Sequence, residues 1–230
     1  MEQPKNNKVN TSLLVALFSL VISIAALGHT FWQSWKYEKE ELIIRIAPNV
    51  ESLPIKFPAI NFGKEGQVIQ LPFKMSVTNN GSRTLSLLEY RTFQLIGEGP
   101  IEKNKKFYTG IDGGLFNLNG TEAQMPTSIS QGETIAYIVY VGILAKKNVI
   151  KILEPYQNKT LSRRSMYKVL GKNGTDLYGN PIDYQENTDG TFSFGVQGKA
   201  NNNPIFVFQW KTGKGNKFVS LGGDYIFSEY

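Results

Sequence analysis

An uncharged, apolar segment near the N-terminus constrains this chain more than any other feature of its sequence. No Asp, Glu, Lys or Arg occurs from Val9 to Trp35, and residues 13–32 are almost all apolar. A helix of about 20 apolar residues spans the roughly 30 Å hydrocarbon core of a bilayer, and its backbone polar groups are satisfied internally there. We therefore expect a single transmembrane helix over residues 13–35, embedded in the lipid bilayer.

The flanks of this segment predict its orientation. Residues 1–12 form a short basic tail with Lys5 and Lys8, and they lead directly into the apolar run. This arrangement is typical of a signal anchor whose N-terminus stays in the cytoplasm. The rest of the chain is then expected outside the cytoplasmic membrane, in the periplasm or at the cell exterior. Because Lys36 and Lys39 follow the helix, the opposite orientation stays open as an alternative, with a cytoplasmic body serving as accessory subunit of a membrane complex.

A cleaved signal peptide is the main rival to a permanent anchor. Residues 26–28 have the small-x-small pattern of a cleavage site. The apolar part of a signal peptide usually ends after about 7–15 residues, whereas this run continues through Phe31 and Trp32. Trp32 and Trp35 also match the aromatic belt at a membrane interface. These features favour the anchor.

Small residues recur along one side of the expected helix. The set is Ser12, Ala16, Ser19, Ser23, Ala26 and Thr30, at steps of 4, 3, 4, 3 and 4 residues. This alternation follows one seam of a left-handed helix pair, and small side chains let helices approach closely in lipid. We expect this face to contact another helix, from a second copy or from a partner protein. Ser and Ala are common in any membrane helix, so a helix without such a contact is the alternative.

The absence of cysteine and the single histidine remove several chemistries. Without Cys the chain has no disulfide, no thiolate nucleophile and no zinc–thiolate site. The one histidine, His29, lies at the end of the apolar run, where an interfacial polar residue is expected. A Ser-His-Asp triad and His-ligated zinc therefore lack their residues, and no phosphate-binding G-x-x-x-x-G-K-[ST] motif occurs. We expect no enzymatic activity, no cofactor or metal, and no nucleic-acid partner.

Alternation and turn signals predict strands after the membrane segment. Phe73, Met75 and Val77 alternate with polar residues, as in a half-buried strand. The Asn-Asn-Gly-Ser sequence at 79–82 predicts a hairpin turn. In the return strand, residues 84–96, the apolar face shifts at Leu87-Leu88, which indicates a β-bulge.

The remaining soluble part continues this pattern with one helical interruption. Residues 134–144 are apolar on both faces and β-branched, so they predict a central strand. Residues 146–170 have helical character, with Gly171 as the expected C-cap. Phe206, Phe208 and Trp210 share one face of a strand and are expected in the core. Further strands are expected at 42–46, 192–196, 205–210, 217–220 and 225–227. Short strands separated by turn signals predict a mainly β sandwich or barrel with one or two short helices.

The stretch Leu71 to Tyr90 (LPFKMSVTNNGSRTLSLLEY) resembles the first hairpin of bacterial Ig-like domains, and the later SISQGET before a long apolar strand is similar to a second feature of them. Together with the N-terminal anchor, the chain resembles uncharacterised bacterial single-pass surface proteins. The resemblance implies an Ig-like sandwich over residues 42–230. Residues 36–41 (KYEKEE) form a charged collar between the membrane helix and this sandwich, and they are expected to extend the helix by a turn beyond the membrane. The resemblance implies no catalytic or binding residue, because fold does not determine function.

Two sets of charged residues are candidate sites. Arg163, Arg164, Lys168 and Lys172 form the densest basic cluster, a candidate contact for a phosphate or other anion; a solvated surface is the alternative. Acid–base glycoside chemistry needs two carboxylates, and the candidates are Asp112, Glu122, Asp183, Glu186, Asp189 and Asp224. Their spacing selects no pair. Asp183, Glu186 and Asp189 could converge on a calcium ion, but the segment lacks the D-x-D-x-D-G order of a loop site, and an acidic hairpin surface is the favoured alternative.

These patterns together predict a membrane-anchored, non-enzymatic protein that binds another protein or a cell-envelope component. A single helix localises it and mediates contact with itself or a partner, and sheet edges or hairpin tips provide the binding surface. The alternatives are an acidic-residue hydrolase that acts on envelope glycans and the cytoplasm-facing accessory subunit.

Overall fold

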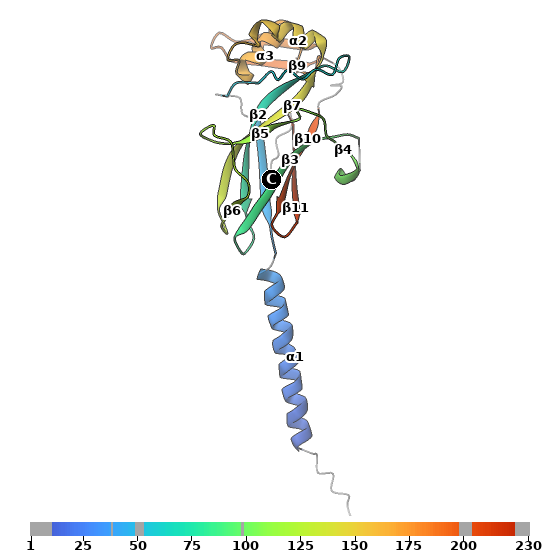
Figure 1. Cartoon of the computed structure of the whole chain (residues 1–230), viewed down its shortest axis with the longest axis vertical. Helices are drawn as coiled ribbons and strands as arrows, with labels where there is room; N and C mark the ends of the chain where they lie inside the picture. Colours follow the sequence, from blue (N-terminus) through green and yellow to red (C-terminus); the bar gives the residue numbers. More distant parts are fainter. Residues whose placement is uncertain (1–10, 38, 49–52, 98, 198–203, 224–230) are drawn as a thin grey trace, which may run out of the picture.

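The computed structural model describes residues 11–37, 39–48, 53–97, 99–197 and 204–223, and it has three parts arranged along one axis (Figure 1). Helix α1 (Thr11–Tyr37) extends from one end of a β-sandwich. Two short helices and a hairpin, called the cap below, cover the opposite end. The expected mainly β fold behind an N-terminal apolar helix is therefore confirmed.

The sandwich consists of two antiparallel sheets. The first has the order β1 (Leu42–Pro48), β2 (Gln67–Asn79), β7 (Thr134–Ala145) and β5 (Asp112–Asn117). The second has the order β11 (Lys217–Gly222), β10 (Ile205–Thr212), β3 (Leu85–Leu95) and β4 (Lys105–Lys106), with β6 (Thr127–Ile129) also paired to β3. A short 3₁₀ helix, η1 (Ile101–Lys103), precedes β4. As expected from its apolar faces, β7 is an inner strand of its sheet.

One hydrophobic core lies between the sheets. Phe73, Met75 and Val77 of β2 are fully buried, and they meet the buried face of β10, which carries Phe206, Phe208 and Trp210. The rings of Phe73 and Phe208 lie 6.2 Å apart across the interface. Burying a side chain of this size stabilises the fold by about 1.5–3 kcal/mol. The period-2 prediction for both strands is therefore confirmed.

The predicted bulge in β3 is also present. Glu89 pairs with Lys211, and the next pair along the ladder is Leu87 with Thr212. The register skips Leu88, whose side chain is exposed. The extra residue turns Leu87 and Leu85 towards the core, which explains why the apolar pattern shifts at this point.

The strand directions place the cap opposite α1. Leu42 at the start of β1 pairs with Asn79 at the end of β2, so both lie at the end near α1. At the far end, Gln67 of β2 pairs with Ala145, the last residue of β7. The chain leaves β7 there and re-enters the second sheet at Ile205, beside Leu95. The segment between β7 and β10 must therefore lie at the end of the sandwich that is distal to α1, as Figure 1 shows.

The cap contains α2 (Lys147–Leu153), a 3₁₀ turn η2 (Glu154–Tyr156), α3 (Arg163–Lys172) and the hairpin of β8 (Ile182–Glu186) and β9 (Phe192–Val196). Ser162 caps α3 by accepting a hydrogen bond from the Ser165 N–H at 3.1 Å. The two helices lie in the expected helical region of the sequence.

The prediction that Gly171 ends this helix is wrong. Gly171 lies inside α3, and the helix ends at Lys172, followed by Gly174 with a φ of +67°. A Cβ atom on Gly171 would lie 2.2 Å from the Tyr184 ring. Gly171 is therefore required for close packing of β8 on α3, while Gly174 adopts the left-handed conformation after the helix.

The junction between α1 and the sandwich differs from the expected helical collar. Helix α1 ends at Tyr37, and Lys39 to Glu41 are not helical. Glu40 accepts hydrogen bonds from Thr212 (2.5 Å) and Asn216 (2.9 Å) in the β10–β11 hairpin. Glu41 accepts one from the Asn80 side chain at 3.0 Å in the β2–β3 turn. These side chains attach the collar to the base of the sandwich, which explains why the helix does not continue.

Candidate functional site

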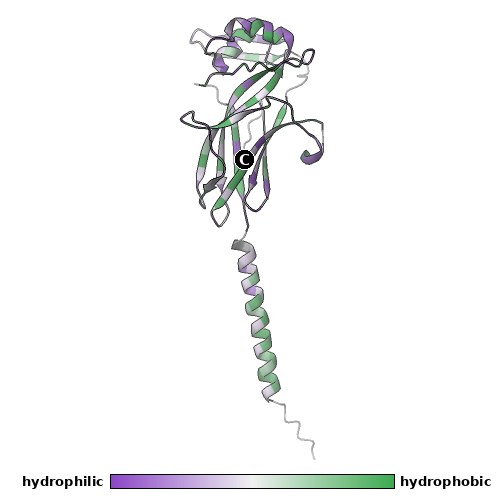
Figure 2. Cartoon of the chain, viewed as in Figure 1, coloured by the Kyte–Doolittle hydropathy of each residue, from purple (hydrophilic) through white to green (hydrophobic). Residues whose placement is uncertain are grey.

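Helix α1 is long and apolar enough to cross a membrane. Its apolar stretch, Ser12–Trp35, has 24 residues and includes an 18-residue window with a mean hydropathy of 2.1, none of which is buried by the rest of the chain. At 1.5 Å per residue it is about 36 Å long, which exceeds the thickness of the hydrocarbon core. Figure 2 shows apolar residues along α1 and hydrophilic residues on the cap helices.

The six small residues of the predicted seam are presented by this exposed helix. The Ser23 hydroxyl donates to the Ser19 carbonyl and the Thr30 hydroxyl to the Ala26 carbonyl, each at 2.9 Å. Hydroxyls that bond to the preceding turn leave little polar surface. The face therefore stays small and weakly polar, and its contact with another helix remains a prediction.

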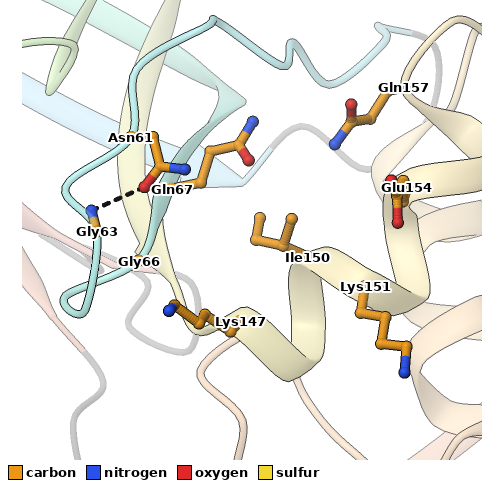
Figure 3. Close-up of a pocket in the computed structure, with 9 residues that line it drawn as sticks. All are labelled: Asn61, Gly63, Gly66, Gln67, Lys147, Ile150, Lys151, Glu154 and Gln157. Atoms are coloured by element: carbon orange, nitrogen blue, oxygen red, sulfur yellow. Dashed lines mark hydrogen bonds between the residues drawn. The ribbon is translucent and has the colours of Figure 1, made fainter.

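A pocket of about 370 Å³ lies between the 61–67 segment and the cap (Figure 3). Its lining residues come from the loop before β2, from α2 and from η2; they are Asn61, Gly63, Gly66, Gln67, Lys147, Ile150, Lys151, Glu154 and Gln157. The Asn61 side chain accepts a hydrogen bond from the Gly63 N–H at 2.8 Å, which fixes the loop. The pocket thus has one wall on the sandwich and one on the cap.

The side chains of this pocket suit a neutral polar ligand. Figure 3 shows Gln67, Gln157 and Ile150 directed into the space between loop and helix. The amines of Lys147 and Lys151 lie at its margin and point away from the amide groups. Amide side chains both donate and accept hydrogen bonds, so the pocket offers recognition of hydroxyl or amide groups, and the Glu154 carboxylate lines it as well.

A second pocket, of about 300 Å³, lies wholly on the cap. Arg164 and Tyr167 of α3 line it together with Thr191 and Phe192 of the β8–β9 hairpin. Tyr167 is buried, Phe192 is half-buried and Arg164 is exposed. The pocket therefore joins an aromatic surface to an accessible cation.

The structure divides the predicted basic cluster of Arg163, Arg164, Lys168 and Lys172. Arg163 is fully buried and donates to the Pro72 carbonyl at 3.1 Å. Lys168 and Lys172 both form ion pairs with Glu186, at 2.8 and 2.9 Å. Hydrogen bonds from these two lysines lower the pKa of Glu186 to about 2. Only Arg164 remains as an exposed cation outside these contacts, so the four residues do not form one anion-binding surface.

The candidate carboxylates are distributed over different elements. Asp112 lies on β5, where burial raises its pKa, and Glu122 forms a bridge with Phe116 of the same strand. The other three lie on the β8–β9 hairpin: Asp183 accepts from Gln197, Glu186 from the two lysines, and Asp189 from Thr191. Asp224 lies outside the described residues. Within the described part of the chain, no group of three or more His, Asp or Glu side chains is arranged to hold a metal ion.

Sequence reasoning missed the aromatic residues of the cap. The rings of Tyr167 and Phe194 stack with centroids 5.7 Å apart, and those of Phe194 and Phe192 with centroids 6.4 Å apart. The alternation of Phe192 and Phe194 with Ser193 and Gly195 placed both phenylalanines on one face of a strand. Their proximity to α3 is a tertiary contact that this pattern does not contain.

Comparison with known proteins found no matching family model, no matching curated protein and no matching solved structure.

Proposed function

We propose that this protein is a single-pass, non-enzymatic membrane protein that holds its β-sandwich outside the cytoplasmic membrane and binds another protein or an envelope component through its cap. The observation that carries this proposal is the position of α1 and the cap at opposite ends of the sandwich (Figure 1). A bilayer around α1 would leave both cap pockets as the most distant part from the membrane. This is where a partner in the envelope reaches the protein first.

The exposed surface of α1 supports the membrane assignment. Side chains such as Leu13, Phe18 and Phe31 are more than half exposed, and in water this apolar surface would be unfavourable by about 25 cal/mol per Å². Lipid removes this cost without any protein cover. His29 and Gln33 bond to each other near the end of the helix, at 3.4 Å, which suits the polar interface of a bilayer.

The strand order supports an Ig-like sandwich. The seven strands β1, β2, β3, β5, β7, β10 and β11, lettered A to G in chain order, have the orders A-B-E-D and C-F-G in the two sheets. These are the sheet orders of the immunoglobulin constant-type fold. On this reading the cap is an insertion between strands E and F, at the end opposite the N-terminus.

The hydrogen bonding of the carboxylates supports a binding role. Catalytic carboxylates in glycosidases face each other across a bound sugar, about 5–10 Å apart. Glu186 is instead held by two lysines, Asp189 by the turn at Thr191 and Asp183 by Gln197. Such contacts fix the hairpin, and those of Glu186 and Asp189 lower the pKa of these two carboxyl groups, which does not favour a general acid.

Fractionation and protease accessibility of the full-length chain test the proposal. Expressed in bacteria with its own N-terminus, the protein is expected in the membrane pellet after carbonate extraction, with an intact mass that includes residues 1–35. External protease should digest it in intact spheroplasts. A variant with Val21→Arg and Ile24→Arg is the control, because a charge at the middle of a membrane helix costs about 2.5–3.5 kcal/mol; it should leave the pellet.

Three outcomes would contradict the proposal. Recovery of the wild-type chain in the soluble fraction would remove the anchor, and loss of the N-terminal residues from the mature mass would indicate a signal peptide. Digestion only after lysis of the spheroplasts would place the sandwich in the cytoplasm.

A further inference from the structure

The cap pocket beside Phe192 has an aromatic surface that no core contact covers completely. Tyr167, Phe194 and Phe192 form a stack in which successive ring planes differ by 28° and 17°. The Phe192 ring also contacts the Tyr184 ring, with centroids 5.8 Å apart, and the Lys168 ammonium lies 6.0 Å from its centroid. Phe192 is half-buried, whereas Tyr167 is 8% exposed. The part of Phe192 that these neighbours leave exposed lines the pocket, where it suits the apolar face of a flat or ring-shaped ligand.

The guanidinium of Arg164 is held at the edge of this pocket by the hairpin turn. Its Nη2 donates to the Gly190 carbonyl at 3.2 Å. The turn itself is fixed, because Asp189 accepts from the Thr191 N–H (2.8 Å) and hydroxyl (2.7 Å), and the Asn187 amide donates to the same hydroxyl. A guanidinium has five N–H donors in a fixed plane. Most donors of Arg164 therefore remain available to a ligand, in an orientation that the bond to Gly190 fixes.

The charge around the pocket matches one negative charge on a ligand. No carboxylate lies within 4 Å of an Arg164 nitrogen in the described part of the chain. The surface around the pocket carries three cations and two carboxylates, so its local charge is +1. The cations are Arg164, Lys168 and Lys172, and the carboxylates are Glu186 and Asp189. A planar carboxylate fits a guanidinium through two parallel hydrogen bonds.

The wider charge distribution agrees with an anionic partner at the cap. Residues 146–197 contain eight basic and five acidic residues, a net charge of +3, whereas the whole chain has +6. The cap lies at the end opposite α1 (Figure 1). The headgroups of the protein's own membrane are therefore far from this pocket, and its anion must come from another component of the envelope.

We infer that the pocket formed by Arg164, Tyr167, Thr191 and Phe192 binds a carboxylate-bearing sugar unit of an acidic polysaccharide. One such unit supplies both an apolar ring face for Phe192 and a carboxylate for Arg164, within a volume of about 300 Å³. An acidic peptide side chain has the carboxylate and lacks the ring, so it would leave the aromatic surface uncovered. This inference rests on the proposed binding function and assigns its ligand class and site.

Binding of the purified full-length protein, reconstituted in nanodiscs of neutral lipid, tests the inference. The probes are immobilised oligosaccharides that contain glucuronic, galacturonic or muramic acid, together with their neutral counterparts and the methyl ester of oligogalacturonate. Binding to at least one carboxylated series is expected, and the matching neutral sugar or ester should bind at least tenfold more weakly, because the charge for Arg164 is absent.

Variants separate the site from general charge attraction. Arg164→Gln and Phe192→Leu should each weaken binding at least tenfold. The first removes an exposed charge and its hydrogen bond to Gly190, and the second keeps an apolar side chain in the packed hairpin. Lys147→Gln removes an exposed cation at the other pocket and should change binding by less than twofold. Unchanged thermal unfolding of each variant verifies that the cap is folded.

Several results would overturn the inference. One is the absence of binding to every carboxylated series. Another is an equal loss of binding in Lys147→Gln and Arg164→Gln. A third is binding of the protein to glutamate-rich peptides but not to sugars. Because the protein is purified and reconstituted, these results are independent of its orientation in cells. If the sugar-binding test fails while fractionation and protease accessibility give the expected results, the proposed ligand is rejected and the proposed membrane anchor is kept.

Discussion

The guanidinium of Arg163 lies over the ring of Phe73, with 4.5 Å between its Cζ and the ring centroid. Arg163 belongs to α3 of the cap, and Phe73 belongs to β2 of the sandwich. Both side chains are fully buried. A desolvated contact of this kind contributes about 2 kcal/mol, so it joins the cap to the sandwich core.

Truncation of Arg163 should therefore destabilise the protein strongly. Arg163→Ala removes this contact and the hydrogen bond to Pro72, and it leaves a cavity, so the free energy of unfolding should fall by about 2–4 kcal/mol. Thermal unfolding of the full chain in detergent micelles measures the effect. The neighbouring Arg164→Ala is the control, because its exposed side chain should contribute less than about 0.5 kcal/mol. Equal melting temperatures for the two variants would contradict this account.

The position of Arg163 also shows where sequence reasoning gave too much weight to charge. Arg163, Met166, Tyr167 and Leu170 are spaced i, i+3, i+4 and i+7, and the structure buries all four. That spacing defines one face of a helix. Helical period therefore predicts the burial of Arg163 correctly, whereas the count of basic residues grouped it with the exposed Arg164.

Local patterns predicted the parts of the fold that depend on neighbouring residues. The alternation around Phe73 and the bulge at Leu88 follow from short stretches of sequence. The hairpin predicted at 79–82 is wrong, because the chain crosses there from one sheet to the other and β2 pairs with β1 and β7 instead of β3. The position of the cap follows from pairing between β2 and β7, which are more than 50 residues apart. The pocket beside Phe192 requires the hairpin to pack on α3. Neither relationship has a signal in a short window of sequence.

Gly171 should be intolerant of a side chain despite its position inside a helix. Ala favours a helix by about 1 kcal/mol over Gly, yet its Cβ would lie 2.2 Å from the Tyr184 ring. Displacement of β8 should outweigh the helical gain, so Gly171→Ala is expected to lower stability by about 1–3 kcal/mol. The matched control is Gly195→Ala on β9, where a Cβ meets nothing within 4 Å. Thermal unfolding of both variants measures the effect. A melting temperature of Gly171→Ala above that of wild type would refute the packing argument.

The ion pairs of Glu186 should make the cap sensitive to acid. Lys168 and Lys172 lower the pKa of Glu186 to about 2 in the folded protein, from a usual value of 4.5. A carboxyl group with a lowered pKa stabilises the folded state above its unfolded pKa and loses this effect as the pH falls through its folded pKa. Glu186→Gln should therefore have a lower melting temperature than wild type at pH 7, and the difference should vanish between pH 4.5 and 2. A difference that is constant over this range would exclude the linkage.

The small seam of α1 should control association of the helix if it contacts a second copy. Ser19→Leu with Ser23→Leu places two large side chains on this face, and it should prevent close approach of the helices. Model pairs in membranes gain about 1–2 kcal/mol from such contacts, so association should fall about tenfold. Energy transfer between labelled chains in vesicles measures it. Val21→Leu with Ile24→Leu keeps the seam and should associate as wild type does; equal association of the two double variants would argue against the seam.

The carboxylate of Glu40 should hold the sandwich in a fixed position relative to the end of α1. It accepts hydrogen bonds from Thr212, which is fully buried, and from Asn216. Because the chain has no cysteine, spin labels at Ser34→Cys and Gln131→Cys report one distance between the helix and the base of the sandwich. The distribution of this distance should be narrow in wild type.

Glu40→Ala should broaden that distribution, because the collar then has no charged link to the β10–β11 hairpin. Asn216→Ala removes one of the two donors and should broaden it less, whereas Glu122→Ala lies beside β5, away from the collar, and should leave it unchanged. Hydrogen bonds to charged groups contribute about 1.5–3 kcal/mol each, which is enough to keep the attached state dominant at room temperature. A broad distribution in wild type would mean that the cap is not held at a fixed distance from the membrane, and the link between collar and sandwich would then have no role in presenting the binding surface.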